Sequence, residues 1–309
     1  MATPILIDCD PGHDDAMALL LALASPELEL LGVTTVHGNQ TLDKTTANAL
    51  RVLELAGRGD TPVAAGADRP LTRAPRVAAS VHGESGLDGP DLPPPAGTPV
   101  AQHAVDFLAE RLAAADRPLT LIPTGPLTNI GLLLAQHPGV ADRIERIVLM
   151  GGAIAEGNVT PAAEFNIWVD PEAAARVFAS GIDVTMVGLD VTHRALMTRA
   201  HADALRATGR IGAVVAELWA FYHQFHVRVY DFPGTPIHDA LAVAHVIGGD
   251  LLRTEHRNVE IETASELCRG RTVVDLWRVS GREANTHVAV EVDGPAFLDL
   301  LVERIGSLG

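Results

Sequence analysis

The sequence predicts an α/β protein with an open, mostly parallel central sheet flanked by helices. Strand-like apolar runs alternate with segments of helical periodicity along most of the chain, which is typical of successive βαβ units. Shortly after four of these runs stand Asp10, Asn39, Thr124 and the pair Gly151-Gly152. Because ligands bind outside the carboxyl ends of the strands in open parallel sheets, this placement predicts one cleft at that edge.

The first strand, turn and helix are the clearest elements. Residues 5–9 begin with an apolar run, Pro11 and Gly12 signal a turn, and 14–24 have helical periodicity. By the same signals, further strands are expected at 29–36, 119–123, 146–150 and 183–188. Further helices are expected at 41–56, 100–115, 127–136, 171–180, 199–208, 210–226 and 239–247.

The last third of the chain carries short runs at 257–263, 272–277 and 287–292 that could extend the sheet, and a helix near 295–306. Segment 66–99 is rich in Pro, Gly and Asp and predicts a long loop, which in compact domains is often functional. No internal repeat is present, and 309 residues, 47% of them hydrophobic, can bury a sizeable core. We expect a single domain over 1–309.

Composition and charge exclude several classes of partner. The formal net charge of −16 and the lack of a Lys/Arg-rich tract argue against a nucleic-acid partner. Two cysteines far apart in sequence cannot build a disulfide framework or a Cys-rich zinc site, and they fit a reducing cytoplasm. No apolar run approaches the roughly 18 residues of a membrane span. We expect a soluble cytoplasmic protein that binds no membrane.

The most informative feature is a run of four carboxylates within eight residues, Asp8, Asp10, Asp14 and Asp15, at the first strand-to-helix turn. Four like charges there repel one another unless something neutralises them, and a hard cation with oxygen ligands would do so. Asp14 and Asp15 also fall in the first helical turn, where the helix dipole favours negative charge. A solvated, capped helix start would explain one or two acids, but not four.

This run resembles the N-terminal signature of the nucleoside hydrolases, metal-dependent enzymes that cut the N-glycosidic bond of ribonucleosides. Further motifs similar to that family follow in its order, over nearly the whole chain. They are Val36-His37-Gly38-Asn39, Pro123-Thr124-Gly125-Pro126-Leu127-Thr128-Asn129, Met150-Gly151-Gly152, Glu164-Phe165-Asn166 and His238-Asp239-Ala240. The resemblance implies the open, Rossmann-like fold of that family, the inosine-uridine or pyrimidine branch, a homodimer or homotetramer, and uridine, cytidine or inosine as substrate.

Metal ligands are expected from three places in the chain. Asp10 and Asp15 can face the cleft from the first turn, Asp239 opens the helix at 239–247, and Thr124 can present its backbone carbonyl before a Gly-Pro turn. Three carboxylates, a carbonyl and waters suit Ca²⁺ and require no His or Cys. In the family the matching positions hold calcium. For Asp239 alone, an ordinary helix cap is the competing interpretation.

Short polar side chains with both donors and acceptors suit the hydroxyls of ribose. The resemblance implies this role for Asp14, Asn39, Asn158, Glu164 and Asn166. The spacing of Glu164 and Asn166 predicts that both side chains share one face of an extended segment. Asn158 can equally be a turn residue, because Gly-Asn is a common turn pair. Met150 and Phe165 are either core residues or an apolar floor under the sugar and base.

Cleavage of an N-glycoside builds positive charge on the sugar and negative charge on the departing base. A water activated by the metal and deprotonated by Asp10 can attack, while Asp14 and Glu164 supply negative charge near the sugar. His238, beside the ligand Asp239, can donate to the base, and His82 is a second candidate because of its loop.

The aromatic stretch 222–230 predicts either an amphipathic helix face or a wall that contacts the base. His226 and Tyr230 are the candidates for that wall. The branch of the family in which two tryptophans sandwich a purine is not matched, because no tryptophan stands near His82 or just before His238.

Two rival functions remain open at this level. A haloacid-dehalogenase-like phosphohydrolase would use Asp8 and Asp10 as nucleophile and acid, but it needs a downstream lysine. Lys44 is the only lysine, and it stands at a polar helix start. A non-catalytic nucleoside sensor is the other rival, and the intact set of acids argues against it.

Overall fold

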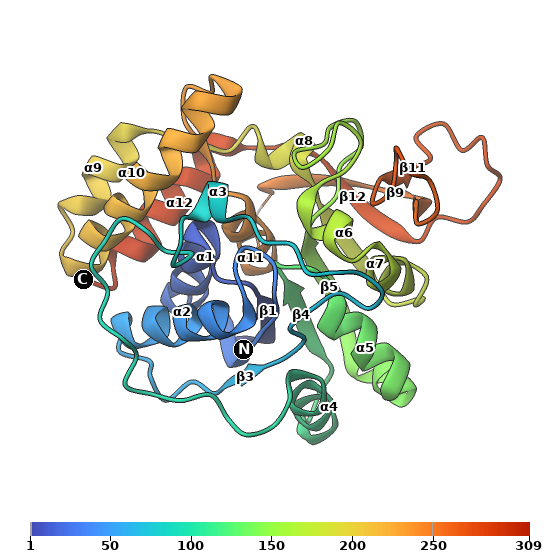
Figure 1. Ribbon diagram of the computed structural model, residues 1–309, viewed down its shortest axis with the longest axis horizontal. Helices are drawn as coiled ribbons and strands as arrows, with labels where there is room; N and C mark the ends of the chain where they lie inside the picture. The colour runs from blue at the N-terminus through green and yellow to red at the C-terminus, as the bar shows by residue number, and fades with distance from the viewer. Residues whose placement is uncertain (1, 249) are drawn as a thin grey trace.

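The computed structural model describes residues 2–248 and 250–309 and confirms the predicted α/β class (Figure 1). Within those residues the main sheet has eight strands in the spatial order β3-β2-β1-β4-β5-β6-β12-β9. Neighbouring strands run parallel except for the pair of β12 and β9. These strands are β1 (Thr3–Cys9), β2 (Leu28–Thr35), β3 (Val63–Ala65), β4 (Leu119–Pro123), β5 (Ile144–Met150), β6 (Val184–Val187), β9 (Leu252–Arg257) and β12 (Thr286–Val292).

Helices cover both faces of the sheet, and two small antiparallel pairs, β7 with β8 and β10 with β11, lie outside it. The helices are α1 (His13–Ala24), α2 (Leu42–Leu55), α3 (Ala79–His82), α4 (Ala104–Ala114), α5 (Thr128–Gln136), α6 (Phe165–Val169), α7 (Pro171–Phe178), α8 (Leu189–Thr192), α9 (Arg199–Arg206), α10 (Arg210–Tyr230), α11 (His238–Ile247), α12 (Gly294–Gly306) and the 3₁₀ turn η1 (Pro138–Arg143). The paired short strands are β7 (Leu196–Met197), β8 (Thr235–Pro236), β10 (Val259–Ile261) and β11 (Thr272–Val274).

Strand β1 is apolar on both of its faces because both are covered. Ile5 and Ile7 join the core beneath α1, α2, α11 and α12, whereas Leu6 joins the core beneath α4, α5 and α7. Continuous apolar strands are what a parallel sheet buried on both sides requires. From β1 the chain first winds outward to β2 and β3 and then returns to β4 on the other side, so the strand order reverses between β1 and β4. Open sheets bind ligands at such a reversal.

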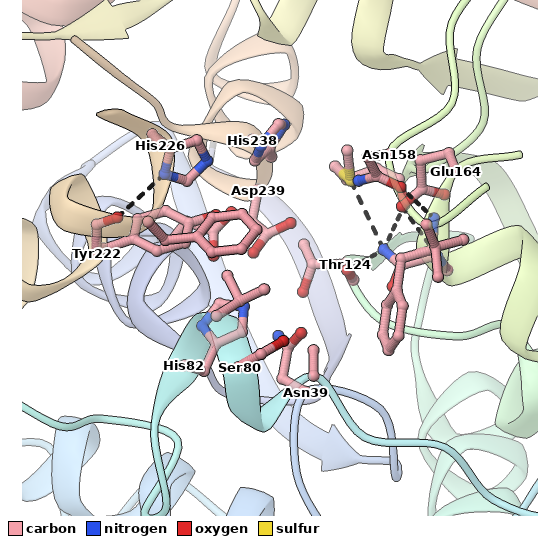
Figure 2. A pocket seen from close by; sticks show the side chains of 18 of the residues that line it. Asn39, Ser80, His82, Thr124, Asn158, Glu164, Tyr222, His226, His238 and Asp239 are labelled. Atoms are coloured by element: carbon pink, nitrogen blue, oxygen red, sulfur yellow. Dashed lines mark hydrogen bonds between the residues drawn. The ribbon is translucent and has the colours of Figure 1, made fainter. Parts of the chain in front are cut away.

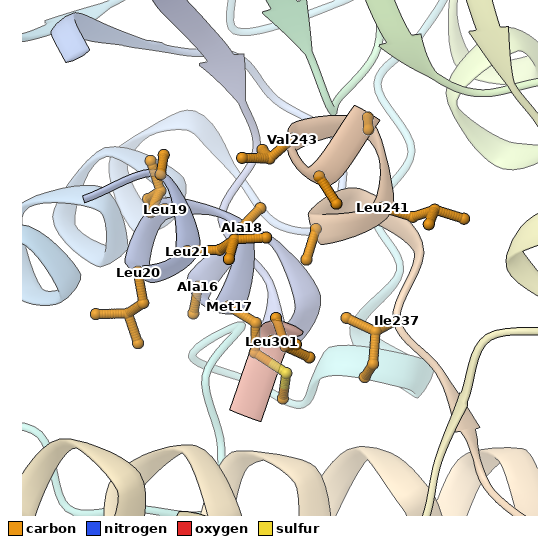
Figure 3. Packing of buried hydrophobic residues seen from close by; sticks show 14 of the residues in the cluster. Ala16, Met17, Ala18, Leu19, Leu20, Leu21, Ile237, Leu241, Val243 and Leu301 are labelled. Carbon is orange, nitrogen blue, oxygen red and sulfur yellow. The ribbon is translucent and has the colours of Figure 1, made fainter. Parts of the chain in front are cut away.

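The first core is built around the packing of α1 on α11. Leu19 and Leu20 of α1 are fully buried, as are Leu241 and Val243 of α11 and Leu301 of α12 (Figure 3). Burial of each such side chain contributes about 1.5–3 kcal/mol. This contact also brings the N-termini of α1 and α11 together, which decides where the acidic residues of both helices lie.

Three sequence predictions need correction. The segment 66–99 is not entirely loop, because α3 forms within it, and β3 was not expected. The runs at 257–263 and 272–277 do not extend the main sheet, because β10 and β11 pair with each other outside it, and β9, which does join the sheet, ends at Arg257. The helix expected from residue 100 begins at Ala104, where the His103 side chain accepts a hydrogen bond as its N-cap. In the described part of the chain, no helix has the length and apolar character needed to cross a bilayer.

Candidate active site

A cavity of about 290 Å³ opens at the carboxyl ends of the central strands, where the strand order reverses. In Figure 2, Asp239 and Thr124 lie in its middle, with Tyr222 and the histidines on one side and Glu164 and Asn158 on the other. The sequence-predicted residues that line it are Asp14, Asn39, His82, Thr124, Met150, Asn158, Glu164, Phe165, Asn166, His226, Tyr230, His238 and Asp239. Asp10 and Asp15 do not reach the cavity wall and are fully buried.

The first turns of α1 and α11 bring three carboxylates close to one another. Oxygens of Asp14, Asp15 and Asp239 all lie within 4.8 Å of one another, and all three side chains are buried. Burial, together with the charge of Asp15, raises the pKa of Asp14 to about 7. Burial and the charges of Asp14 and Asp15 raise the pKa of Asp239 well above its usual value. Ionising all three therefore requires a compensating positive charge.

Asp10 stands beside this trio but is not a member of it. Its Oδ2 accepts a hydrogen bond of 2.6 Å from the backbone N–H of Asn39, while its buried Oδ1 has no partner among the described residues. Burial and then the charge of Asp15 raise the pKa of Asp10 well above its usual range. A Cβ at Gly38 or Gly125 would overlap the oxygens of Asp10, so those turns need glycine.

Hydrogen bonds hold Asp15 and Thr124 in fixed orientations. Oδ1 of Asp15 accepts from the Thr124 hydroxyl at 2.8 Å, and Oδ2 accepts from the Gly12 backbone N–H and the Asn39 amide, each at 3.0 Å. The Thr124 carbonyl, the predicted ligand, accepts from the Asn166 amide at 2.7 Å. A carbonyl oxygen has a second lone pair, which leaves it free to act as a ligand.

This donor set fits a hard divalent cation. Its atoms are carboxylate and carbonyl oxygens, one buried carboxylate oxygen lacks a partner, and no Lys or Arg pairs with these acids in residues 2–248 and 250–309. The four residues predicted as ligands, Asp10, Asp15, Thr124 and Asp239, therefore lie close together, and Asp14 lies beside Asp15 and Asp239.

Asp8, in contrast, lies outside the site. Its side chain belongs to the sheet, where Oδ1 accepts from the hydroxyl of Thr34 at 2.5 Å and from the amide of Asn129 at 2.8 Å. Burial raises its pKa to about 7. The run of four acids in the sequence therefore supplies three acids to the site and one to the sheet, because Asp8 lies within β1 whereas the other three follow the end of that strand.

The start of α6 carries two of the residues predicted to bind the sugar, Glu164 and Asn166. Glu164 is the N-cap of this helix and accepts from the backbone N–H groups of Gly152 and Asn166, each at 2.9 Å. The prediction that Glu164 and Asn166 share a face of an extended segment was wrong, since Asn166 lies in the first turn of α6. Both residues still line the cavity. Burial raises the pKa of Glu164 to about 7.

Asn158 holds the loop before α6 in place. Its side-chain oxygen accepts from the backbone N–H of Phe165 at 2.9 Å. Asn158 therefore lies in a bend of this loop and also lines the cavity.

The other side of the cavity is rich in histidine. Nδ1 of His238 lies 2.7 Å from the Thr192 hydroxyl, and Nδ1 of His226 donates to the Tyr222 carbonyl at 3.1 Å (Figure 2). Burial lowers the pKa of His82 and His238 well below the usual value, and it lowers that of His226 to about 4. These rings are thus neutral near neutral pH and act as hydrogen-bond donors or acceptors.

Several lining residues were not predicted from the sequence. Tyr222 and Phe225 belong to the aromatic stretch that was singled out, and helical periodicity places them beside His226 and Tyr230 on α10. His193, just after α8, carried no local signal. The remaining residues are small or apolar neighbours of predicted ones: Val77, Ala78, Ser80, Val81 and Val159.

Comparison of the chain with known protein families identifies one family. The profile described as inosine-uridine preferring nucleoside hydrolase matches residues 5–299. The chain belongs to this family. The resemblance seen in the sequence motifs is therefore confirmed, and the cavity at the strand reversal is the candidate active site of a nucleoside hydrolase.

Curated relatives of this nucleoside hydrolase match it along its whole length. It is 52% identical over 307 residues to the pyrimidine-specific ribonucleoside hydrolase RihA of Shewanella sp. (strain ANA-3), covering 99% of this chain and 96% of that one. The protein of the same name from Salmonella typhimurium (strain LT2) is 51% identical, with 99% of each chain covered. A solved purine-preferring ribonucleoside hydrolase from Gardnerella vaginalis has a TM-score of 0.93, 35% identity and 99% coverage of both chains.

Proposed function

We propose that this protein hydrolyses the N-glycosidic bond of ribonucleosides, releasing free base and ribose, with a preference for pyrimidines. The observation that carries this proposal is one cavity with buried carboxylates in its middle, amide and carboxylate groups on one side and neutral histidines on the other. The pyrimidine preference is supported by relatives of that stated specificity at about half identity, against 35% for the purine-preferring structure.

Calcium is the metal we propose, held by Asp10, Asp15, Thr124 and Asp239, with Asp14 as an additional ligand. Oxygen-only donors and several carboxylates favour Ca²⁺ over the softer transition metals. When bound, the cation supplies charge neutralisation and polarises the attacking water. Asp10 accepts the proton of that water, and its unpartnered Oδ1 is the atom available for it.

The ribose is held by the opposite wall in this proposal. Asn39 and Asn166 offer amide groups to the hydroxyls, and Asn158 contributes from the loop before α6. Asp14 and Glu164 place negative charge where the sugar becomes cationic. Met150 and Phe165 provide the apolar floor. Preorganised charge in a buried site is worth far more than in water.

His238 is our candidate donor to the departing base. If the Thr192 hydroxyl donates to Nδ1 of His238, the ring proton stands on Nε2 and is available to the cavity. His226 and Tyr230 complete the wall on this side, and their rings are 5.9 Å apart and stacked.

A single assay distinguishes the proposed hydrolase from the two rival functions, a phosphohydrolase and a non-catalytic nucleoside sensor. Lys44, the lysine that a phosphohydrolase would need, contacts Gln40 and Glu84 and does not line the cavity. We expect the calcium-loaded protein to release base and reducing sugar from uridine and cytidine, more slowly from inosine, and no phosphate from p-nitrophenyl phosphate. Phosphate release, or binding of nucleosides without base release, would contradict the proposal.

The replacement of His238 by alanine tests its role as donor. We expect kcat/KM for uridine to fall by about 10²–10³-fold, the scale of losing one preorganised hydrogen-bond donor to the developing negative charge of the base. The loss with p-nitrophenyl riboside should be much smaller, because its leaving group needs little protonation. An equal loss on both substrates would mean that His238 organises the sugar or metal site instead. The same pair of assays on His82→Ala asks whether a second donor operates.

We expect a homodimer or homotetramer of single-domain chains in the cytoplasm. The segment around β11 carries exposed apolar side chains, of which Trp277 is 86% exposed, and it projects from the body in Figure 1. An exposed apolar surface of this kind is typical of a protein contact.

A further inference from the structure

The loop that carries Asn158 has little apolar packing to hold it at the cavity. It connects β5 to α6, and its residues 155–162 are all exposed or only half-buried. A segment with few buried apolar contacts opens locally at low cost unless polar contacts fix it. Within the loop, the backbone N–H of Asn158 donates to the Ala163 carbonyl at 3.1 Å. The position of the whole loop therefore depends on its polar contacts to neighbouring elements.

Helix α8 is the rigid neighbour of this loop. Val191 and Thr192 of this one-turn helix are fully buried, and in Figure 1 the loop before α6 lies beside it. The carboxylate of Asp190 accepts hydrogen bonds from two backbone N–H groups of the loop, that of Ile154 at 2.6 Å and that of Ala155 at 3.2 Å. The first part of the loop is thus tied to a buried helix.

The residue directly after α8 makes a further contact to the loop. Nδ1 of His193 lies 2.6 Å from Oε2 of Glu156. An ionised carboxylate can only accept a hydrogen bond, so the imidazole donates. The His193 side chain is 10% exposed, and its ring contacts the rings of Phe232 and His238 edge-on, at 5.3 and 5.6 Å between centroids. The Glu156 side chain is half-exposed, so the packed ring is the fixed partner of this pair.

We infer that Glu156 and His193 are positioning residues that tie the loop before α6 to the end of α8 and so hold Asn158 at the sugar. The proposed ribonucleoside hydrolase function, on which this role rests, assigns nothing to either residue. Glu156 does not line the active-site cavity, whereas His193 and Asn158 do. The carboxylate of Glu156 therefore acts on the substrate through the loop and not by contact.

The same helix also holds the candidate donor to the base. The Thr192 hydroxyl lies 2.7 Å from Nδ1 of His238. Two successive residues, Thr192 and His193, thus fix one group on each side of the cavity. Release of the loop should loosen the contact of Asn158 to the sugar and leave His238 in place.

Amide hydrogen exchange, measured residue by residue by NMR on the whole protein, tests this tie without any substrate. The Asn158 side chain accepts from the backbone N–H of Phe165 at 2.9 Å, so exchange of that N–H reports whether Asn158 is in place. In Glu156→Ala it should exchange about tenfold faster, the scale of one hydrogen bond. In Glu156→Gln, whose amide oxygen still accepts from His193, most of the protection should return. Unchanged exchange in Glu156→Ala would overturn the inference.

Steady-state kinetics on uridine test the consequence for the sugar. In Glu156→Ala we expect KM to rise by about tenfold while kcat stays within about twofold, because a contact made equally in the ground and transition states changes KM alone. Glu156→Gln should lie close to the wild type. A fall in kcat at unchanged KM would place the effect at the donor His238 and would contradict the inference.

A double-mutant cycle separates positioning of Asn158 from a direct role of His193. If Glu156 acts through Asn158, adding Glu156→Ala to Asn158→Ala should cost no further activity. A loss of the full size in the Asn158→Ala background would refute the inference, since Glu156 would then act on the substrate through the His193 ring.

Asp183→Ala is the matched control. Asp183 is also a half-exposed carboxylate beside a histidine, with Oδ1 at 3.5 Å from Nε2 of His287, and it lies outside the cavity. Exchange at Phe165 and the kinetics on uridine should stay at wild-type values. Changes as large as those in Glu156→Ala would mean that general destabilisation, and not the tie to α8, explains both variants.

Failure of the proposed function has a different signature. The wild-type protein would then cleave no ribonucleoside, while the faster exchange at Phe165 in Glu156→Ala would stand unchanged.

Discussion

Replacing Asp239 or Asp10 by alanine is expected to abolish turnover and to remove bound calcium. Asp239 belongs to the buried acidic trio, and Asp10 presents a buried carboxylate oxygen that has no partner in the described residues. No neighbouring side chain can replace an anionic ligand that lies at the start of a packed helix or turn. We expect kcat/KM to fall by about 10³-fold or more, the scale of losing a preorganised charged group.

Elemental analysis of the dialysed protein is the measurement for this prediction, with activity assayed on the same samples. We expect one calcium per wild-type chain and none in Asp239→Ala. The matched control is Asp43→Ala, because Asp43 is also an acid in the first turn of a helix but is exposed. It should keep both calcium and activity. Zinc at full occupancy without calcium would contradict the site that we describe.

The second large effect is the preference for ribose over 2′-deoxyribose. We expect uridine to be cleaved about 10⁴-fold better than 2′-deoxyuridine. A site whose buried polar groups pair with a hydroxyl leaves them unsatisfied when that hydroxyl is missing, and discrimination on this scale follows. Asp14 and Asn166 are both nearly fully buried and line the cavity, so water compensates poorly for the missing group.

Steady-state kinetics on the two substrates measure this ratio. In Asn166→Ala the rate on uridine should fall much more than the rate on deoxyuridine, so the ratio should shrink. Comparable rates on both substrates in the wild type would refute the assigned roles of Asp14 and Asn166. An unchanged ratio in the variant would move the recognition of the hydroxyl to other groups.

Much of the fold could be predicted because its signals are local. Apolar runs, helical periodicity and the Pro11-Gly12 turn defined β1 and α1 within a residue or two, and similar signals located β4 and α5. The position of polar residues just after strands predicted one cleft, since parallel strands end at a common edge. Short elements such as α3 and β3 were missed, because a single turn or three residues carry too little periodicity.

The residues that line the histidine-rich wall of the cavity could be predicted less well than the acidic residues. Nothing in the local sequence separates His193, which lines the cavity, from His137, which does not. Nor does it connect His13 to His82, which are 69 positions apart and meet only because the loop carrying α3 lies over the start of α1. Such contacts depend on how loops pack on the sheet.

The sequence by itself determined the α/β class, the alternation of the longer strands and helices, and the residue types at the candidate site. Only the tertiary structure decided that Asp8 forms its hydrogen bonds within the sheet while Asp14 joins Asp15 and Asp239, and that Glu164 caps α6 at the cavity wall. The physical reason is the distance along the chain over which each effect acts. Periodicity and turn chemistry act over a few residues, whereas the groups that share a buried site are chosen by strand order, register and helix packing across the whole chain.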